Sequence, residues 1–364
     1  MRFYTKKHRH YCGIDLHARS MYLCIITHDG EIVLHRNMPA APEPFLKAIE
    51  PYREDLVVAV ECIFTWYWLA DLCGREKIPF VLGHALYMKA IHGGKAKNDR
   101  IDSRKIAGLL GSGMIPQAYV YPAEMRGTRD LLRRRNHLVR KRSDLLSHIQ
   151  NTNSQWNLPA FENRINRKSH REEIAERFID PCVRKSIELD VELIDHYDRL
   201  VWNLESHILT TARHHNPRAL HLLRTVHGIG KVLSLVILYE IHDICRFPRV
   251  QDFASYSRLI KCAKESAGKR YGTSGKKIGN AHLKWAFSEA AVLFLRANPE
   301  GLKYKRKLEQ KHGKAKALSI LAHRLGRAVY YMLLRDNPFD MRKFLNEGSG
   351  GDERAKCLTG AVTE

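Results

Sequence analysis

Long apolar runs and cysteine motifs are missing from this sequence. No stretch of 18 consecutive apolar residues occurs among its 364 residues, so no segment is predicted to span a bilayer. The basic residues 1–11 are not followed by an apolar stretch of the signal-peptide type, and a cytoplasmic location is expected. The 8 cysteines include no Cys-x-x-Cys pair, and the 20 histidines include no His-Glu-x-x-His motif. This scatter argues against zinc-ribbon and disulfide-framework proteins and fits reduced thiols.

Acidic residues are scarce relative to basic ones. The chain has 61 Lys and Arg against 39 Asp and Glu, a formal charge of +22, and a pI near 9.7. Its 364 residues are enough for two or three domains with a substantial core. A polyanion is the simplest partner for this excess of positive charge, and nucleic acid is the favoured one. A membrane surface is the weaker alternative.

The first third of the chain has the pattern of an α/β domain. We predict strands at residues 11–18, 21–27, 31–37, 55–61 and 80–82, and helices at 42–52, 64–75 and 97–110. Asp29–Gly30 marks a turn between the second and third strands. Three antiparallel strands followed by alternating strands and helices predict a mixed sheet. Ribonuclease-H-like nucleases use this order of elements.

Four acids lie where such a domain would carry a site. Asp15 is in the first predicted strand, and Glu61 ends the fourth. Asp99 and Asp102 open a helix, and a spacing of three puts both on one face, although capping of the helix is an alternative explanation. Converging carboxylates repel one another unless cations bind, and their oxygens suit Mg²⁺ or Mn²⁺. Two such ions would support phosphodiester chemistry.

A basic helical segment follows from about residue 122. Residues 126–142 contain eight basic residues and one acid; the basic ones are Arg126, Arg129, Arg133, Arg134, Arg135, Arg140, Lys141 and Arg142. Heptad spacing of apolar residues from Leu131 to Leu146, and again from Ile187 to Ile208, predicts an antiparallel coiled-coil arm. The basic face is either solvated or bound to nucleic acid. The apolar seam serves either intramolecular packing or dimerisation.

Two glycine-containing segments follow the arm. Gly228, Gly230 and Lys231 belong to a turn between apolar helical segments, typical of a phosphate-binding helix-hairpin-helix; an ordinary turn is the alternative. Residues 257–280 are predicted to form a basic, glycine-rich loop suited to a phosphate backbone. Its candidate binding residues are Lys269, Arg270, Lys276 and Lys277, and its central hydroxyls are Ser266 and Ser274. On spacing alone, either serine is a phosphate hydrogen-bond donor rather than a nucleophile.

The combination of motifs resembles a known family. A Gly-Ile-Asp strand, a Val-Glu strand end, a Lys-x-Asp-x-x-Asp helix, a basic coiled coil, a Gly-Ile-Gly turn and a Ser-x-Gly-Lys-Arg loop occur in this order within residues 11–335. This order resembles the DEDD transposases of the IS110 group of insertion sequences, which are related to pilin-gene invertases. The resemblance implies a RuvC-like nuclease domain that binds Mg²⁺ through an acidic tetrad. The tetrad maps onto Asp15, Glu61, Asp99 and Asp102.

The same resemblance implies further roles and partners. A nucleophilic serine maps onto Ser266, and it is expected to form a transient covalent link to DNA and to meet the tetrad of another protomer. Glu265 and Ala267 depart from a Ser-Ser-Gly-Gly-like loop, and residues 272–277 resemble the IS1111 subgroup, so Ser274 is the lesser candidate. The implied partners are element and target DNA, a structured guide RNA and further copies of the chain in a dimer or tetramer. A nucleoid-associated, prokaryotic protein is expected.

The expected function is therefore that of a site-specific DNA recombinase, a transposase. The alternative is a RuvC-like metal-dependent nuclease or junction resolvase that uses water, and a non-catalytic nucleic-acid-binding protein is a third class. The expected fold class is α/β plus α, with a RuvC-like domain at residues 1–120, a coiled-coil arm at 121–215 and a mostly helical transposase domain at 216–345. Residues 346–364 are expected to be disordered.

Overall fold

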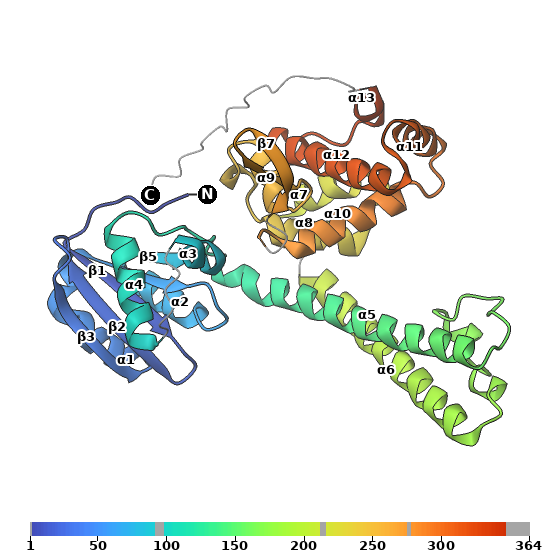
Figure 1. Ribbon diagram of the computed structural model, residues 1–364, viewed down its shortest axis with the longest axis horizontal. Coiled ribbons are helices and arrows are strands. Elements are labelled where there is room, and N and C mark those ends of the chain that lie inside the picture. Colours follow the sequence, from blue (N-terminus) through green and yellow to red (C-terminus); the bar gives the residue numbers. More distant parts are fainter. Residues whose placement is uncertain (1, 92–97, 212–215, 275–277, 347–364) are drawn as a thin grey trace. The chain divides into compact units, whose positions relative to one another are not determined.

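The computed structural model describes residues 2–91, 98–211, 216–274 and 278–346 (Figure 1). The chain divides into two compact units, Met1–Glu124 and Met125–Glu364. The candidate residues Lys276 and Lys277 and residues 347–364 of the expected tail lie outside the described residues, whereas Asn346 ends the last helix. Within the described ranges, no helix is both long enough and apolar enough to cross a membrane.

A five-stranded mixed sheet forms the middle of the first unit. Its strands are β1 (His10–Leu16), β2 (Ser20–Thr27), β3 (Ile32–Pro39), β4 (Leu56–Glu61) and β5 (Phe80–Gly83), in the order β3-β2-β1-β4-β5. β2 pairs antiparallel with β1 and β3, whereas β4 pairs parallel with β1 and β5. The predicted mixed sheet is confirmed. β4 lies inside the sheet, between β1 and β5, and is an unbroken apolar run from Leu56 to Val60 because helices cover both of its faces.

Helices pack on both faces of this sheet. They are α1 (Pro42–Ile49), α2 (Tyr67–Arg75), α3 (Ala85–Ile91) and α4 (Asp99–Gly111), with the 3-10 turn η1 (Glu50–Asp55) after α1. Side chains alternate along a strand, so Ile14 and Leu16 of β1 pack with α1 and α2, whereas Tyr11 packs with α4 on the other face. α3 is absent from the predicted elements.

Two long helices open the second unit. They are α5 (Ala123–Gln155) and α6 (Pro181–Thr211), joined by a segment with the 3-10 turns η2 (Lys168–His170) and η3 (Ala175–Arg177). Ion pairs join Arg135 to Glu205 and Arg142 to Asp198, which makes the helices antiparallel, as Figure 1 shows. The seam of α6 is buried at each of its four heptad positions, Ile187, Ile194, Val201 and Ile208. Supercoiling of the pair into a true coiled coil stays a prediction.

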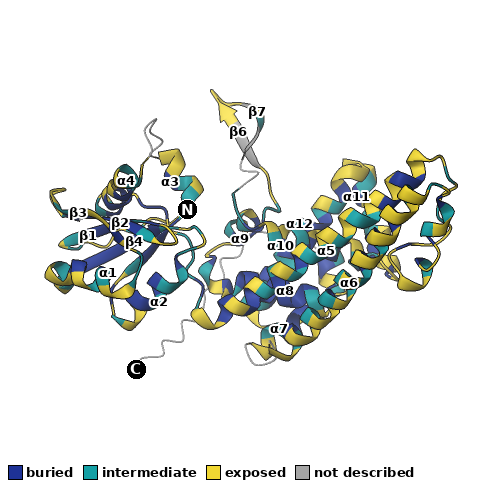
Figure 2. Cartoon of the chain, turned by 90° about the horizontal axis from the view of Figure 1, so that it is seen from below, coloured by how far each residue is buried: buried dark blue, intermediate teal, exposed yellow. Residues whose placement is uncertain are grey.

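A helical body makes up the rest of the second unit. Its helices are α7 (Pro217–Arg224), α8 (Lys231–Ile241), α9 (Val250–Tyr256), α10 (Ala281–Phe294), α11 (Pro299–His312), α12 (Lys314–Arg335) and α13 (Met341–Asn346), with the 3-10 turn η5 (Ile244–Arg246). α8 is buried from Leu233 to Ile241 (Figure 2). Its core residues pack with those of α10 and α12. α7 and α8 flank the Gly-x-Gly turn, and the helix-hairpin-helix assignment stays a prediction.

A β-hairpin stands where the sequence pattern predicts a loop at residues 257–280. Strands β6 (Cys262–Ser266) and β7 (Lys269–Ser274) pair antiparallel. Ala267 and Gly268 have φ values of 48° and 72°, and two successive positive φ values are the geometry of a tight two-residue turn. The loop prediction was wrong because these strands are polar and lack the apolar alternation that identifies a strand.

Candidate active site and basic surface

Gly13 allows α4 to lie directly against β1. A Cβ at this position would lie 2.2 Å from the backbone nitrogen of Ala107 and 2.5 Å from the carbonyl oxygen of Ser103, both in α4. Tyr11, Gly13 and Asp15 lie on the same face of β1, because alternate residues of a strand point the same way. The close approach of the helix therefore brings the first turn of α4 to the end of the strand that carries Asp15.

Asp15 and Asp99 meet at this end of the sheet, with His17 beside both. Nε2 of His17 lies 3.6 Å from Oδ2 of Asp15 and 3.4 Å from Oδ1 of Asp99. The three side chains present ligand atoms that all lie within 4.8 Å of one another. His17 was missed at the level of sequence. Its spacing of two from Asp15 in an extended segment, which puts both on one face, was the available signal.

Glu61 reaches the same region from the neighbouring strand. The parallel pairing of β1 with β4 aligns Ile14 with Val60, and the next residues along the two strands are Asp15 and Glu61. Val57, four residues before Glu61 in β4, packs on the α4 side of the sheet. Because alternate residues of a strand share a face, Glu61 lies on this side too.

The electrostatics of Asp15 reflect this convergence. Burial raises the pKa of Asp15, and the nearby His17 opposes the rise. The negative charges of the three other acids, Asp99, Asp102 and Glu61, raise the pKa further. Asp15 thus interacts with each of the three other predicted acids, and each negative charge makes an ionised Asp15 less favourable.

Neither acid of α4 is its side-chain cap. The N-cap is Asn98, whose Oδ1 accepts a hydrogen bond of 2.8 Å from the backbone nitrogen of Ile101. Asp102 instead pairs with Lys105, at 3.3 Å. A favourable interaction with the helix dipole remains, but the capping explanation for Asp99 and Asp102 does not hold.

The donor set of this cluster fits a divalent cation. Carboxylate oxygens are the ligands that Mg²⁺ and Mn²⁺ prefer, and a cation would relieve the repulsion that raises the pKa of Asp15. The imidazole of His17 adds a nitrogen donor, which suits Mn²⁺ better than Mg²⁺.

The candidate serine lies on the hairpin of the second unit. Ser266 ends β6, is exposed, and pairs in backbone register with the exposed Lys269 across the turn. Both residues are accessible to a large substrate. The side chains of Arg270 and Ser274 lie outside the described part of the structure.

The basic residues of α5 separate into two groups. Arg133, Arg135 and Arg142 donate to carboxylates of other helices, with nitrogen–oxygen distances of 2.7 Å, 2.8 Å and 2.5 Å. These three stabilise helix packing. Arg126 and Arg129 are buried as well, so the basic residues of this run that are exposed to solvent are Arg134, Arg140 and Lys141.

Packing accounts for one of the two glycines in the Gly-x-Gly turn. Gly228 has a φ of 86°, and a Cβ there would lie 2.4 Å from the backbone nitrogen of Phe294 in α10. Gly230 has no atom within 4 Å of the corresponding position and forms the N-cap of α8. Gly230 and the exposed Lys231 are therefore accessible to an anion, whereas Gly228 is required by the contact between the turn and α10.

One buried carboxylate was not predicted from the sequence. Glu240 is only 2% exposed and lies near the end of α8. It pairs with Arg129 and Arg133 of α5. A single acid inside the otherwise uncharged segment 232–241 was the available signal, since a charge in a buried helix requires a partner.

These features define a class of protein. The strand order of the first unit, its helices on both faces and the acids at β1, β4 and α4 are those of a ribonuclease-H-like domain, a class that includes nucleases and transposases. Residues 12–155 match the model of the DEDD transposases of the IS110 type, described as a transposase family. Residues 220–306 match the Transposase IS116/IS110/IS902 family.

A curated relative agrees with both matches. The chain is 21% identical over 339 residues to the transposase for insertion sequence element IS1111A of Coxiella burnetii (strain RSA 493 / Nine Mile phase I), and the alignment covers 90% of each chain. The chain belongs to the IS110 group of insertion-sequence transposases. The resemblance predicted from the sequence motifs is thereby confirmed.

Proposed function

We propose that this protein cleaves and rejoins DNA strands as a site-specific recombinase that moves an insertion sequence. Membership of a transposase family supports the proposal. The observation that carries it is the convergence of Asp15 and Asp99 at the end of β1, within electrostatic reach of Glu61 and Asp102. A protein that only bound DNA would gain nothing from negative charge gathered at one point of a +22 chain.

The four acids would hold Mg²⁺, or Mn²⁺, in this proposal. When bound, the cation supplies positive charge to the oxygens of the scissile phosphate and to the attacking group. The protein's own residues prepare the site: Gly13 brings α4 close to β1, and Asn98 caps α4, which leaves the carboxylate of Asp99 free to bind. His17 lies close enough to orient Asp15 and Asp99.

Ser266 is the proposed nucleophile. Its Oγ forms a bond to the phosphorus of a DNA phosphodiester while the bond from phosphorus to the oxygen of one strand breaks. The hydroxyl proton passes to solvent, and the departing oxygen takes up a proton. The covalent intermediate keeps a phosphodiester, so attack by the hydroxyl of a second strand rejoins the DNA without a further reagent. The exposure of Ser266 on the hairpin supports this role.

A structured guide RNA and further copies of the chain complete the proposal. The exposed basic residues Arg134, Arg140 and Lys141 on α5 offer a surface for a phosphate backbone. Nucleic acid that copurifies with the protein, resists deoxyribonuclease and is removed by ribonuclease would support the RNA partner. A protein that purifies free of RNA from cells carrying its element would contradict it.

Covalent trapping tests the proposed chemistry. The protein is incubated with Mg²⁺, element-end DNA and co-expressed RNA, and adducts are resolved on a denaturing gel. An adduct is expected in the wild type and in Ser274→Ala, and is expected to be lost in Ser266→Ala and Asp102→Ala.

The competing outcomes are distinct. An adduct lost in Ser274→Ala but kept in Ser266→Ala would move the nucleophile to Ser274. Cleavage that depends on Asp102 but forms no adduct would support a water-using nuclease or junction resolvase instead.

A further inference from the structure

A buried ion cluster lies beneath the hairpin that carries Ser266. The carboxylate of Glu240 accepts hydrogen bonds from Nε of Arg129 at 3.0 Å, from Nε of Arg133 at 2.7 Å and from Nδ2 of Asn280 at 2.7 Å. Three elements far apart in the sequence are thus joined at one side chain: α5 through the arginines, α8 through Glu240, and the start of α10 through Asn280. All of them belong to the second unit.

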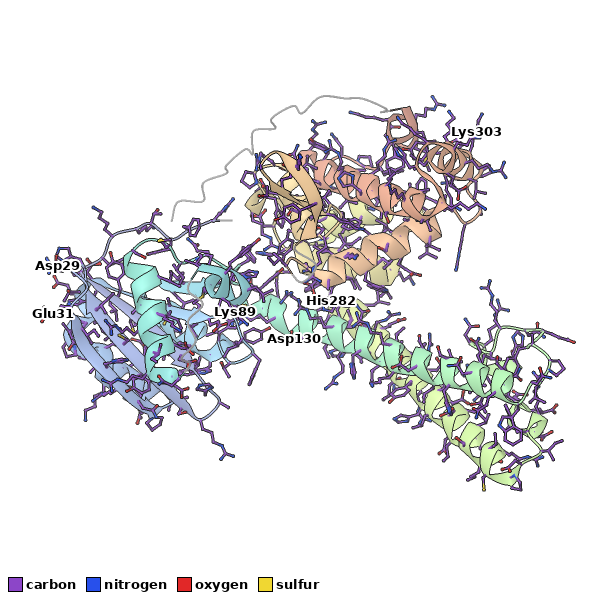
Figure 3. All side chains as sticks on the ribbon, viewed as in Figure 1. Asp29, Glu31, Lys89, Asp130, His282 and Lys303 are labelled. Carbon is purple, nitrogen blue, oxygen red and sulfur yellow. The ribbon has the colours of Figure 1, made fainter. Side chains whose placement is uncertain are left out.

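Asn280 occupies the point where the chain returns from the hairpin. It is the N-cap of α10, and its Oδ1 accepts hydrogen bonds from the backbone nitrogens of His282 at 2.9 Å and Leu283 at 3.1 Å. Its own backbone nitrogen donates to the carbonyl oxygen of Tyr256, at 2.6 Å. Tyr256 is the last residue of α9, on the outgoing side of the hairpin. Figure 3 labels His282 at this end of α10.

The base of the hairpin is closed by these contacts. Besides the bond from Asn280 to Tyr256, Nε of Arg258 donates to the carbonyl oxygen of Ile278, at 2.9 Å. Beyond this base, β6 and β7 pair with each other and project from the helical body, and residues 265–269 are exposed (Figure 2). The orientation of the hairpin is therefore decided where it joins the body.

A small change at this base has a large effect at Ser266. The five residues of β6 span about 16 Å, so a tilt of about 10° at the base would displace its far end by about 3 Å. A misplacement of about 1 Å already costs about a hundredfold in a reaction that depends on orientation.

We propose that Glu240 is a positioning residue for Ser266: through Asn280 it holds the base of the β6–β7 hairpin and links it to the basic helix α5. This inference rests on the nucleophilic role of Ser266 in the proposed function. Glu240 touches no reacting atom; it acts by keeping Asn280 against both Tyr256 and the first turn of α10.

The geometry explains why a charged group occupies this place. Burial by itself raises the pKa of Glu240, but the hydrogen bond from Arg133 and the charges of Arg129 and Arg133 outweigh burial and lower the pKa to about 2. Glu240 is therefore ionised at neutral pH. An ionised carboxylate can receive two guanidinium groups and an amide at once, which a neutral side chain of the same shape cannot do.

Asn280→Ser removes the hydrogen bond to Glu240 but keeps a side-chain cap on α10. Serine is as good an N-cap as asparagine, but its short side chain cannot reach Glu240. Asn298 provides a matched control, because it is also the N-cap of a helix, is equally buried at 7%, and its Nδ2 donates to the carbonyl oxygen of Phe294 where Nδ2 of Asn280 donates to Glu240. Asn298→Ser therefore reports the cost of the substitution itself.

The experiment compares the two variants in the full-length protein. We expect Asn280→Ser to lower the rate of Ser266 adduct formation at saturating DNA at least tenfold, with the DNA concentration for half-maximal rate unchanged. Amide exchange of peptides covering residues 256–262 and 278–284 should become at least tenfold faster. Asn298→Ser should change neither quantity by more than twofold. The melting temperatures of both variants should agree.

A second variant covers failure of the first to fold. Arg129→Lys keeps the positive charge but loses the guanidinium geometry that faces Glu240, and the same two readouts should move in the same direction. Wild-type exchange at the base together with a wild-type adduct rate in Asn280→Ser would overturn the inference. So would equal effects of Asn280→Ser and Asn298→Ser. Absence of any adduct in the wild type would refute the nucleophilic role of Ser266. The exchange measurement would still decide whether Glu240, through Asn280, holds the base of the hairpin.

Discussion

The substitution Glu240→Gln tests the buried cluster most directly. The amide keeps the shape of the side chain but removes the negative charge that faces two guanidinium groups, one of them from the buried Arg129. Removing one partner from a buried ion cluster costs about 3–5 kcal/mol, because the remaining charges stay desolvated. We therefore expect Glu240→Gln to be among the most destabilising single changes in the second unit.

The pH dependence of stability gives a second value for the contribution of Glu240 to the free energy of unfolding. The pKa of Glu240 is lowered from 4.5 to about 2 in the folded protein, in spite of the opposing effect of burial. Because the folded value lies below the unfolded one, the stabilisation is fully present above pH 4.5 and is lost as the pH falls from about 4.5 towards 2. The difference between the two values corresponds to roughly 3 kcal/mol. Glu240→Gln should lack this acid-sensitive component.

Native-state amide exchange measures the effect within the second unit alone. Peptides from α8 and α10 should lose protection about 150- to 5,000-fold in Glu240→Gln at pH 7. Glu309→Gln is the control, because it removes an ion pair of 3.1 Å to Lys305 within α11 and should cost less than about 0.5 kcal/mol. Protection within threefold of wild type in Glu240→Gln, or an unchanged pH dependence, would refute the account of the cluster.

Four further outcomes follow from the geometry. Asp15→Asn should abolish Mg²⁺-dependent cleavage. Because the pKa of Asp15 is raised by burial and by its acidic neighbours, the same change should raise the melting temperature in EDTA at pH 7, and a lower melting temperature would contradict this. Gly13→Ala should push α4 away from β1 and destabilise the first unit by about 2–3 kcal/mol in urea denaturation. An unchanged free energy of unfolding would show that α4 moves without cost. Gly228→Ala should cost a similar amount in the second unit, since the new Cβ meets the backbone of α10 and the φ is positive. Alanine at both Arg134 and Lys141 should leave thermal stability unchanged and reduce the slope of log affinity against log salt for duplex DNA by about 2; an unchanged slope would remove both residues from the DNA interface.

Local sequence pattern accounts for much of the first unit. The strands around Asp15 and Glu61 are apolar runs of the length a strand needs, and their order in the chain predicts the mixed sheet. The family resemblance, too, depends only on the order and spacing of short motifs. Such features are local because backbone period and turn chemistry act over a few residues.

Other features depend on contacts that no local pattern contains. The basic run of α5 reads as one charged surface, yet Arg133 is held by Glu240, which lies 107 residues away in the sequence. The cap of α4 by Asn98 and the position of His17 beside two acids also became visible only in three dimensions. The hairpin of Ser266 has no apolar alternation to reveal it.

The sequence by itself determined the class of this protein: the order of its elements along the chain, its acids, its excess of positive charge and its family. Only the tertiary structure decided which charges are free and which are paired, because burial and pairing arise when distant segments pack together. Gly13 and Glu240 illustrate the difference. Gly13 belongs to a motif that the sequence shows, but only the helix α4 that lies on it explains why a glycine is needed. Glu240 acquires its partners Arg129 and Arg133 only through folding.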